Sequence, residues 1–369
     1  MASIVIRSRT PFPCGEILSV TANGEGGEKL SSGIFTLTET SYGKDTVKTM
    51  LAGGIETPVV NRRGGSVRAM FEYMHKEGGK EGAAVALLHP FAFSFYRKFG
   101  YERVADHVII GTPLPQIDFV PRRCNFVPYD EAKLPDMIKI YNAFRRNRNL
   151  LLPRYDGSRY TGDGKSAYIY YENGEPAAYV VLSGSKTLYV NNYINTRLTV
   201  NELAYVSPSA LCEVFSFLRM FEGEYDRVEF RDGSLCPEVD MMLREYARAD
   251  YKIIPDLQAR VLNTERMLLS ASYPEKEGGF TVKVNDGLPT VNGVFRVEYG
   301  GGDCGVTRLD DDADFDVSLP VGVFTQILYG YGGYNENNVS YANGVTTRRI
   351  CPDLFRAFPP RPCGAFEHF

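Results

Sequence analysis

The sequence predicts a mixed α+β protein with three successive domains, and three patterns carry that prediction. Residues 33–101 give two strands, a glycine-rich loop, a helix and a further buried strand. Residues 166–231 give three strands, a helix and a strand, and residues 280–328 give short strands that lead into a helix. A chain of 369 residues with 44% apolar content is long enough for two or three domains with sizeable cores.

A basic glycine loop, residues 62–66, stands where the predicted helix begins. Val67, Met70, Phe71 and Met74 recur at helical spacing and give that helix one apolar face. The first turn of a helix carries unpaired N–H groups and a partial positive charge. These features favour a binding site for a phosphate or pyrophosphate over the alternative, a solvated basic turn. The residues of the loop are Arg62, Arg63, Gly64, Gly65 and Ser66.

Strand patterns flank the loop on both sides. Residues 33–40 and 46–60 read as two strands joined by a turn. After the helix, Gly78 and Gly79 are candidates to end it, and residues 83–88 form a continuous apolar run. Such a run is typical of a buried strand in a parallel pair. A short helix that contains Tyr96 and ends at Gly100 follows in the chain.

This order of elements resembles a GNAT-type N-acetyltransferase. The loop at residues 62–66 corresponds to the family's pyrophosphate-binding motif for acetyl-CoA, and residues 96–101 (Tyr-Arg-Lys-Phe-Gly-Tyr) match the element that follows the family's fifth strand. The more specific resemblance is to the Eis branch, the enhanced intracellular survival proteins. It covers residues 53–101 closely and, by pattern, most of the remaining chain.

The beginning of the chain departs from that family. A GNAT domain usually has a strand and two helices, some 50 residues, before its central hairpin. Here roughly 30 residues precede the strand at Gly33, and they do not have the pattern of two helices. Since those helices usually form one wall of the acceptor site, the resemblance implies either a shortened domain or a wall that is built otherwise.

The resemblance implies three domains: a shortened GNAT domain at residues 1–122, a second GNAT-like domain at 123–257 and a sterol-carrier-like domain at 258–369. The second domain has Val206-Ser207-Pro208-Ser209 where a phosphate loop belongs, so no acetyl-CoA is expected there. Eis-like proteins are often hexamers, which implies a homo-oligomer, a hexamer or a trimer.

Composition excludes several other classes. The net charge of −4 argues against broad nucleic-acid binding. Seven scattered cysteines without a Cys-x-x-Cys pair favour a reduced, cytoplasmic protein with no metal site. The first residues lack the apolar core of a signal peptide. The sequence contains no run of about 18 apolar residues, so no membrane span is expected.

The resemblance also assigns roles to residues. Ile55 and Thr57 are expected to bind the pantetheine arm of acetyl-CoA through their backbone, beside the pyrophosphate loop. Tyr96 is the candidate general acid, because a phenol holds its proton at neutral pH. The carboxylate of Phe369 is the candidate base, and the aromatic, proline-rich stretch before it favours docking. His89, at the end of the apolar run, is a weaker candidate for the base, with a structural role as the alternative, and His368 is a weaker candidate for assisting at the terminus.

Two functions are compatible with these patterns. The first is acetyl-CoA-dependent transfer of an acetyl group to an amine of a small acceptor, by resemblance a polyamine or an aminoglycoside-like molecule. The alternative is a non-catalytic protein that binds a CoA-type or apolar ligand in an altered GNAT cleft or in the sterol-carrier-like region. Acetyl-CoA binding alone does not distinguish these two functions, because a non-catalytic protein can also bind it. Turnover of acetyl-CoA with an amine does distinguish them.

Overall fold

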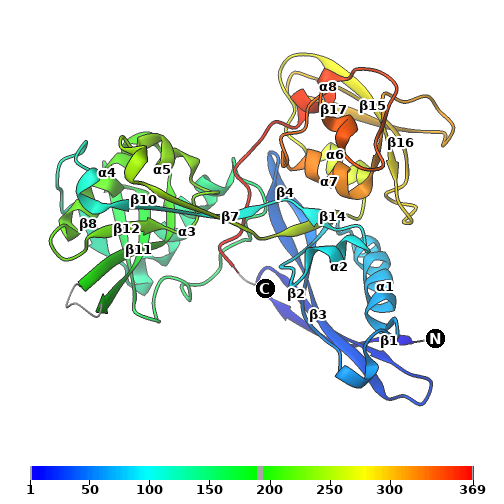
Figure 1. The fold of residues 1–369 in the computed structure, drawn as a ribbon, viewed down its shortest axis with the longest axis horizontal. Helices are drawn as coiled ribbons and strands as arrows, with labels where there is room; N and C mark the ends of the chain where they lie inside the picture. Colours follow the sequence, from blue (N-terminus) through cyan, green and yellow to red (C-terminus); the bar gives the residue numbers. More distant parts are fainter. Residues whose placement is uncertain (1, 189–193, 368) are drawn as a thin grey trace. The chain divides into compact units, whose positions relative to one another are not determined.

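The computed structural model describes residues 2–188, 194–367 and 369, which form two compact units (Figure 1). The first unit contains Met1–Ala105 and Asp256–Phe369, and the second contains Asp106–Pro255. Three sheets and the helices packed on them confirm the mixed α+β class.

The first unit contains a sheet of seven strands in the order β1-β2-β3-β4-β5-β14-β6. Strands β1 to β4 are antiparallel neighbours, and β5 is parallel to β4. The bounds are β1 Ser3–Phe12, β2 Gly15–Asn23, β3 Lys29–Tyr42, β4 Asp45–Glu56, β5 Val85–Leu88, β6 Glu102–Arg103 and β14 Gln258–Val261. The first described residues thus form a hairpin, and none of the described residues before β3 is helical.

Helix α1 (Ser66–Lys80) packs on β2 and β3 through the apolar face that the spacing predicts. Met70, Phe71 and Met74 are fully buried there. The prediction that Gly78 and Gly79 end the helix was wrong. Gly78 lies inside it because a Cβ at this position would lie 2.9 Å from the sulfur of Met50, so the helix can lie close to the sheet only with glycine.

The predicted strand at residues 46–60 also ends earlier than expected. Strand β4 stops at Glu56, and Pro58 leads into a single 3-10 turn, η1, Val59–Asn61. Proline lacks the N–H that a strand ladder needs, which accounts for the early end. The short helix α2 (Phe93–Arg97) contains Tyr96 as predicted.

A second sheet of the first unit lies near the C-terminal end of the sequence, with strand order β17-β16-β15-β18-β19. It has the predicted short strands followed by a helix, α7. The bounds are α6 Thr264–Leu269, β15 Gly278–Asn285, β16 Gly293–Gly300, β17 Asp303–Leu309, β18 Val317–Pro320, α7 Val321–Leu328, η6 Val339–Tyr341, β19 Thr346–Thr347 and α8 Pro352–Ala357. Its likeness to a sterol-carrier domain stays a prediction.

The second unit is a seven-stranded sheet, ordered β13-β7-β12-β11-β10-β9-β8, with helices α3 and α4 packed on it. Its strands are β7 Asp106–Pro113, β8 Phe126–Pro128, β9 Lys165–Glu172, β10 Glu175–Leu188, β11 Ile194–Tyr205, β12 Arg227–Phe230 and β13 Asp250–Pro255. Its helices are η2 Leu114–Gln116, η3 Glu131–Lys133, α3 Leu134–Arg145, α4 Pro208–Leu218, η4 Arg219–Phe221, α5 Pro237–Met242 and η5 Tyr246–Arg248.

Two strands pair across the predicted domain boundaries. Strand β7, on the 1–122 side of the predicted boundary, pairs with β12 and β13 in the second unit. Strand β14, at the start of the predicted third domain, lies between β5 and β6 of the first sheet. The two boundaries themselves stay a prediction. Pairing of strands distant in sequence leaves no local signal, because it depends on which sheet edge is free.

A buried ion pair holds the interior of the second unit. Glu202 on β11 accepts hydrogen bonds from Arg154 Nη2 at 2.9 Å and from the hydroxyl of Tyr179 at 2.5 Å. The Arg154 and Glu202 side chains are only 4% and 2% exposed. Burial and the carboxylate of Glu202 hold the pKa of Tyr179 far above its ordinary value, so the phenol stays a donor.

The packing of α1 generates a first prediction. Phe71 lies within 6 Å, between ring centres, of Phe35, Tyr96, Phe99 and Tyr101. Phe71→Ala therefore leaves a cavity and should lower the free energy of unfolding by about 3–5 kcal/mol. The control is Phe91→Ala, since Phe91 is 76% exposed and should cost far less. Urea unfolding of the two variants checks this, and equal costs would contradict the described packing.

Candidate functional site

The site begins where two parallel strands part. Strands β4 and β5 pair from Thr49 with Val85 to Leu51 with Leu87, and there the pairing stops. Strand β4 continues to Glu56 without this partner, whereas β5 ends at Leu88. The end of β4 therefore leaves backbone N–H and C=O groups facing an opening, where an extended ligand can pair with them. Ile55 lies on this end of β4, which is paired with β3 but not with β5, and Thr57 follows the strand.

The turn from β4 into α1 depends on a left-handed backbone. Arg63 has φ of 67° and Gly65, the residue before the helix, has φ of 82°. A Cβ on Gly65 would meet nothing within 4 Å, so glycine is needed there for its backbone angle and not for space. No side chain caps the start of α1, and its first turn contains no acidic residue. The first N–H groups of α1 are thus left for an anion.

A cavity of about 870 Å³ lies over this turn. Four cationic side chains line it, from Arg62, Arg63, Arg68 and Lys98, and no carboxylate does. Aromatic, aliphatic and neutral polar groups form the remaining wall. The other lining residues are Ile55, Thr57, Asn61, Gly65, Ser66, Val67, Phe91, Phe95 and Phe99. A cationic end beside an apolar wall suits a ligand with phosphates at one end and an uncharged arm at the other.

Tyr96 lies in the aromatic cluster that backs this cavity. Its ring centre is 5.5 Å from Phe91 and 5.0 Å from Phe95, both of which line the cavity. The side chain is 4% exposed, and burial raises the pKa of Tyr96 above its ordinary value. The phenol therefore holds its proton throughout the neutral range.

The Phe369 backbone lies directly against β4. A Cβ placed on Gly53 would lie 2.9 Å from the Phe369 carboxyl carbon and 3.1 Å from its oxygen, and among the described residues it would meet nothing else within 4 Å. Gly53 thus leaves room for the carboxyl group two residues before Ile55. Phe366, only 5% exposed, anchors the segment that leads there.

His89, just beyond the end of β5, holds the same segment. Its Nε2 lies 3.1 Å from the carbonyl oxygen of Glu367, and its ring centre is 4.6 Å from that of Phe369. Its Nδ1 lies 2.9 Å from Asp256 Oδ1. A carbonyl and a carboxylate both accept hydrogen bonds, so both ring nitrogens of His89 face acceptors. His368 lies outside the described residues.

The second unit has a different helix start at the corresponding place. Helix α4 is capped by Ser207, whose side chain accepts from the Ala210 N–H at 3.1 Å. Pro208, the first residue of the helix, has no N–H to offer. The donors that α1 leaves open are thus largely used or missing in α4. The absence of acetyl-CoA from the second domain stays a prediction.

The structure brings most of the predicted binding residues together. Ile55, Thr57, Arg62, Arg63, Gly65 and Ser66 all line the cavity, and Gly64 lies in the same turn. Sequence reasoning missed Arg68 and Lys98. Arg68 lies in the first turn of the helix, with its guanidinium 5.5 Å from the centre of the Phe99 ring, so its place next to the loop could have identified it.

Neither a metal cluster nor a membrane span is found in the part of the chain that the structure describes. No group of three or more His, Cys, Asp or Glu side chains is placed there to hold a metal ion. None of the described helices is long and apolar enough to cross a membrane.

Known proteins share part of this sequence and the fold. Residues 25–104 match the family model of an acetyltransferase (GNAT) domain, whereas no curated protein sequence matches the chain. A GCN5-related N-acetyltransferase from Anabaena variabilis has a TM-score of 0.80 at 15% identity, over 95% of this chain and 89% of that chain. Eis1 from Mycobacterium abscessus has a TM-score of 0.80 at 16% identity, over 100% of both chains.

A probable N-acyltransferase from Enterococcus faecalis is also similar, with a TM-score of 0.76 at 16% identity, over 96% of this chain and 89% of that chain. At such identities the likeness concerns the fold. Together with the matched domain it confirms that the chain contains a GNAT acetyltransferase domain and is a transferase. A GNAT domain implies acetyl-CoA as co-substrate and a small-molecule acceptor.

The phosphate seat generates a binding prediction. A charge-assisted hydrogen bond is worth about 1.5–3 kcal/mol, so Arg63→Ala should weaken acetyl-CoA binding by about 10- to 100-fold. The control is Arg296→Ala, which removes an exposed arginine of β16 and should leave the affinity unchanged. Calorimetry gives both affinities. Unchanged affinity in a folded Arg63→Ala protein would exclude this loop as the seat.

The capped start of α4 generates a second binding prediction. Acetyl-CoA titrated at micromolar concentration should bind with a stoichiometry near one per chain, since α1 begins without a side-chain cap whereas α4, at the corresponding place in the second unit, is capped by Ser207. The same calorimetric titration measures this number. A stoichiometry near two per chain would show that the second unit also holds acetyl-CoA.

Proposed function

We propose that the chain is an acetyl-CoA-dependent N-acetyltransferase that acts on an amine of a small polyamine or aminoglycoside-like acceptor. The observation that carries the proposal is the cavity over the uncapped start of α1, with four cations and no carboxylate beside the parting strands. In this assignment residues 62–66 bind the pyrophosphate, and Ile55 and Thr57 bind the pantetheine arm through their backbone. The acetyl group then reaches the opening between β4 and β5.

Tyr96 is proposed as the general acid. When an amine attacks the thioester, a carbon–nitrogen bond forms and the carbon–sulfur bond breaks, and the leaving thiolate requires a proton. The raised pKa of Tyr96 keeps its phenol protonated until that moment. A thiol has an ordinary pKa of about 8.5, close enough to that of a phenol for transfer in the transition state.

The carboxylate of Phe369 is proposed as the base. An ammonium ion cannot attack a carbonyl, so the acceptor must first lose a proton. A carboxylate fixed beside Gly53 also attracts a cationic acceptor to the unpaired end of β4. His89 is assigned a positioning role, because both of its ring nitrogens already face acceptors, Asp256 and the Glu367 carbonyl. The alternative, His89 as base, requires it to leave at least one of them.

The proposed acid generates a kinetic prediction. Tyr96→Phe removes only the hydroxyl and should slow turnover by about 10²- to 10⁴-fold with little change in acetyl-CoA affinity. Thiol release from acetyl-CoA, measured against a panel of polyamines and aminoglycosides, gives the rates. Tyr73→Phe, which alters a half-buried tyrosine of α1, is the control. Wild-type rates in Tyr96→Phe would exclude the acid role, and no release with any amine would exclude the function.

The close approach at Gly53 generates a second kinetic prediction. Alanine suits the backbone at Gly53, whose φ is not in the left-handed region, but its Cβ would displace the Phe369 carboxyl group. Gly53→Ala should therefore lower kcat by about 10- to 100-fold, as expected for misplacement of a catalytic group. Acetyl-CoA affinity, measured by calorimetry, should be unchanged. A normal kcat would show that the position of this carboxylate does not matter.

A further inference from the structure

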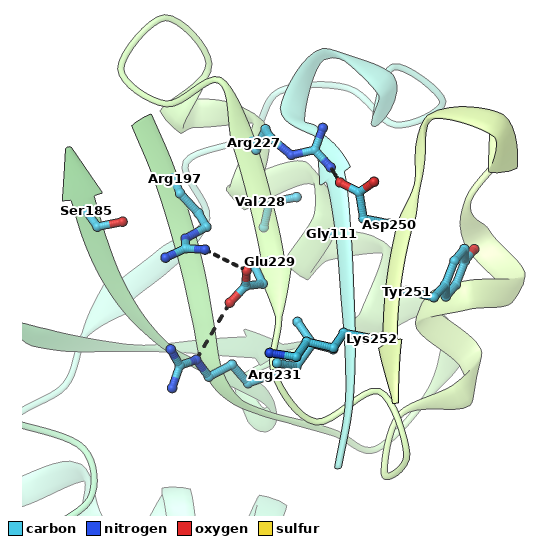
Figure 2. Close-up of a pocket in the computed structure, with 11 residues that line it drawn as sticks. Gly111, Ser185, Arg197, Arg227, Val228, Glu229, Arg231, Asp250, Tyr251 and Lys252 are labelled. Carbon is cyan, nitrogen blue, oxygen red and sulfur yellow. Dashed lines mark hydrogen bonds and ion pairs between the residues drawn. The ribbon is translucent and has the colours of Figure 1, made fainter. Parts of the chain in front are cut away.

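A second cavity, of about 580 Å³, lies on one face of the sheet in the second unit (Figure 2). Five neighbouring strands contribute to it, from β13 through β7, β12 and β11 to β10. The proposed acetyl transfer uses none of its residues. Its charged lining residues are Arg197, Arg227, Glu229, Arg231, Asp250 and Lys252.

Strand alternation places these charges on the same face. Arg227, Glu229 and Arg231 are two residues apart along and just beyond β12, so their side chains share a side of the sheet. Arg197 on β11 lies directly opposite Arg227 in the parallel pairing. Gly111 on β7 pairs with Glu229. Because Gly111 has no side chain, nothing at this position fills the cavity.

Two of the arginines share one carboxylate. Arg197 Nη1 lies 2.9 Å from Glu229 Oε2, and Arg231 Nε lies 3.8 Å from Glu229 Oε1. Figure 2 shows the two guanidinium groups on either side of Glu229. Each guanidinium has five N–H donors in a planar fork, so most of their donors are not used by Glu229.

The cavity has an excess of positive charge. Arg227 pairs with Asp250, while Lys252 makes no ion pair with any of the described residues. Four cationic side chains therefore face two carboxylates, which leaves an excess of two positive charges. Like charges directly opposite on neighbouring strands, as with Arg197 and Arg227, are destabilising unless an anion offsets them.

We propose that this cavity binds the dianionic phosphate group of a small molecule. The two negative charges of the phosphate match the excess of two positive charges in the cavity. A guanidinium group can also donate two parallel hydrogen bonds to phosphate oxygens. The volume is in the range of small-molecule sites and exceeds what one phosphate requires, so it has room for a body of the size of a sugar. Ile109, which is half-buried, provides apolar surface for that body.

The test first removes the other phosphate seat. In an Arg62→Ala, Arg63→Ala background, inorganic phosphate, ribose 5-phosphate and ribose are titrated at pH 8 and low salt, with calorimetry and melting temperature as readouts. The two phosphates should bind and raise the melting temperature, and ribose should not. Tighter binding of ribose 5-phosphate identifies a phosphorylated molecule as the ligand, and equal binding identifies free phosphate. If no phosphate binding is detected at phosphate concentrations up to 20-fold above about 1 mM, the proposal is overturned.

Variants then locate the site. Arg197→Ala with Arg231→Ala should weaken phosphate binding at least about 10-fold, since two charge-assisted contacts are lost. Both side chains are about half exposed, so the unliganded melting temperature should change little. Undiminished binding in this variant would place the phosphate elsewhere and overturn the assignment.

Weaker binding in a variant can come from loss of the site or from loss of folding. A substitution that is expected to strengthen binding avoids this ambiguity. Glu229→Gln keeps the shape of the side chain but frees both guanidinium groups and raises the excess to three charges. Phosphate affinity should rise about 3- to 10-fold. Glu224→Gln, which removes an exposed carboxylate paired with Lys186 in the same unit, should leave it unchanged. Weaker or unchanged binding in Glu229→Gln would contradict the proposed competition between Glu229 and phosphate.

Discussion

The loss of pairing between β4 and β5 after Leu51 and Leu87 is the constraint on which the site depends. Up to that point the two strands form part of a buried sheet, and beyond it β4 continues to Glu56 with β3 as its neighbour on one side only. Because the strands have parted, the end of β4 keeps unpaired backbone groups and the next turn can deliver the start of α1 to the same opening. The left-handed Arg63 and Gly65 make that turn possible.

The first unit joins segments that are far apart in the sequence around this opening. Asp256 and Glu367 lie on either side of His89 and are 167 and 278 residues away from it. Strand β14 lies beside β5 in the first sheet, and Asp256 stands two residues before this strand begins. The placement of the Phe369 carboxyl group therefore depends on the fold of the whole unit and not on the GNAT-like segment alone. Gly53 is the local feature that leaves room for it.

Local patterns were enough to predict the strand–loop–helix segment, since apolar spacing, glycines and arginines act within about 20 residues of one another. They also predicted Tyr96 on a short helix. They could not predict that β7 and β14 pair across the assumed boundaries, or that Asp256 would contact His89, because these pairings depend on distant strands. The helix end at Gly78 was wrong because contact with Met50, not helix propensity, selects glycine there. The cationic face of the second unit was not predicted because its cationic residues come from β11, β12 and β13, which are far apart in the sequence.

The central claim is that a carboxylate at Phe369 serves the acetyl-transfer site, and extension of the chain beyond Phe369 by a few residues tests it most directly. The extension moves the carboxylate without altering residues 62–66 or Tyr96. Acetyl-CoA affinity and the rate of thiol release with a reactive amine are measured side by side. The account predicts normal affinity and turnover slowed by about 10²- to 10⁴-fold. Turnover at the wild-type rate would contradict it and would move the search for the base to His89.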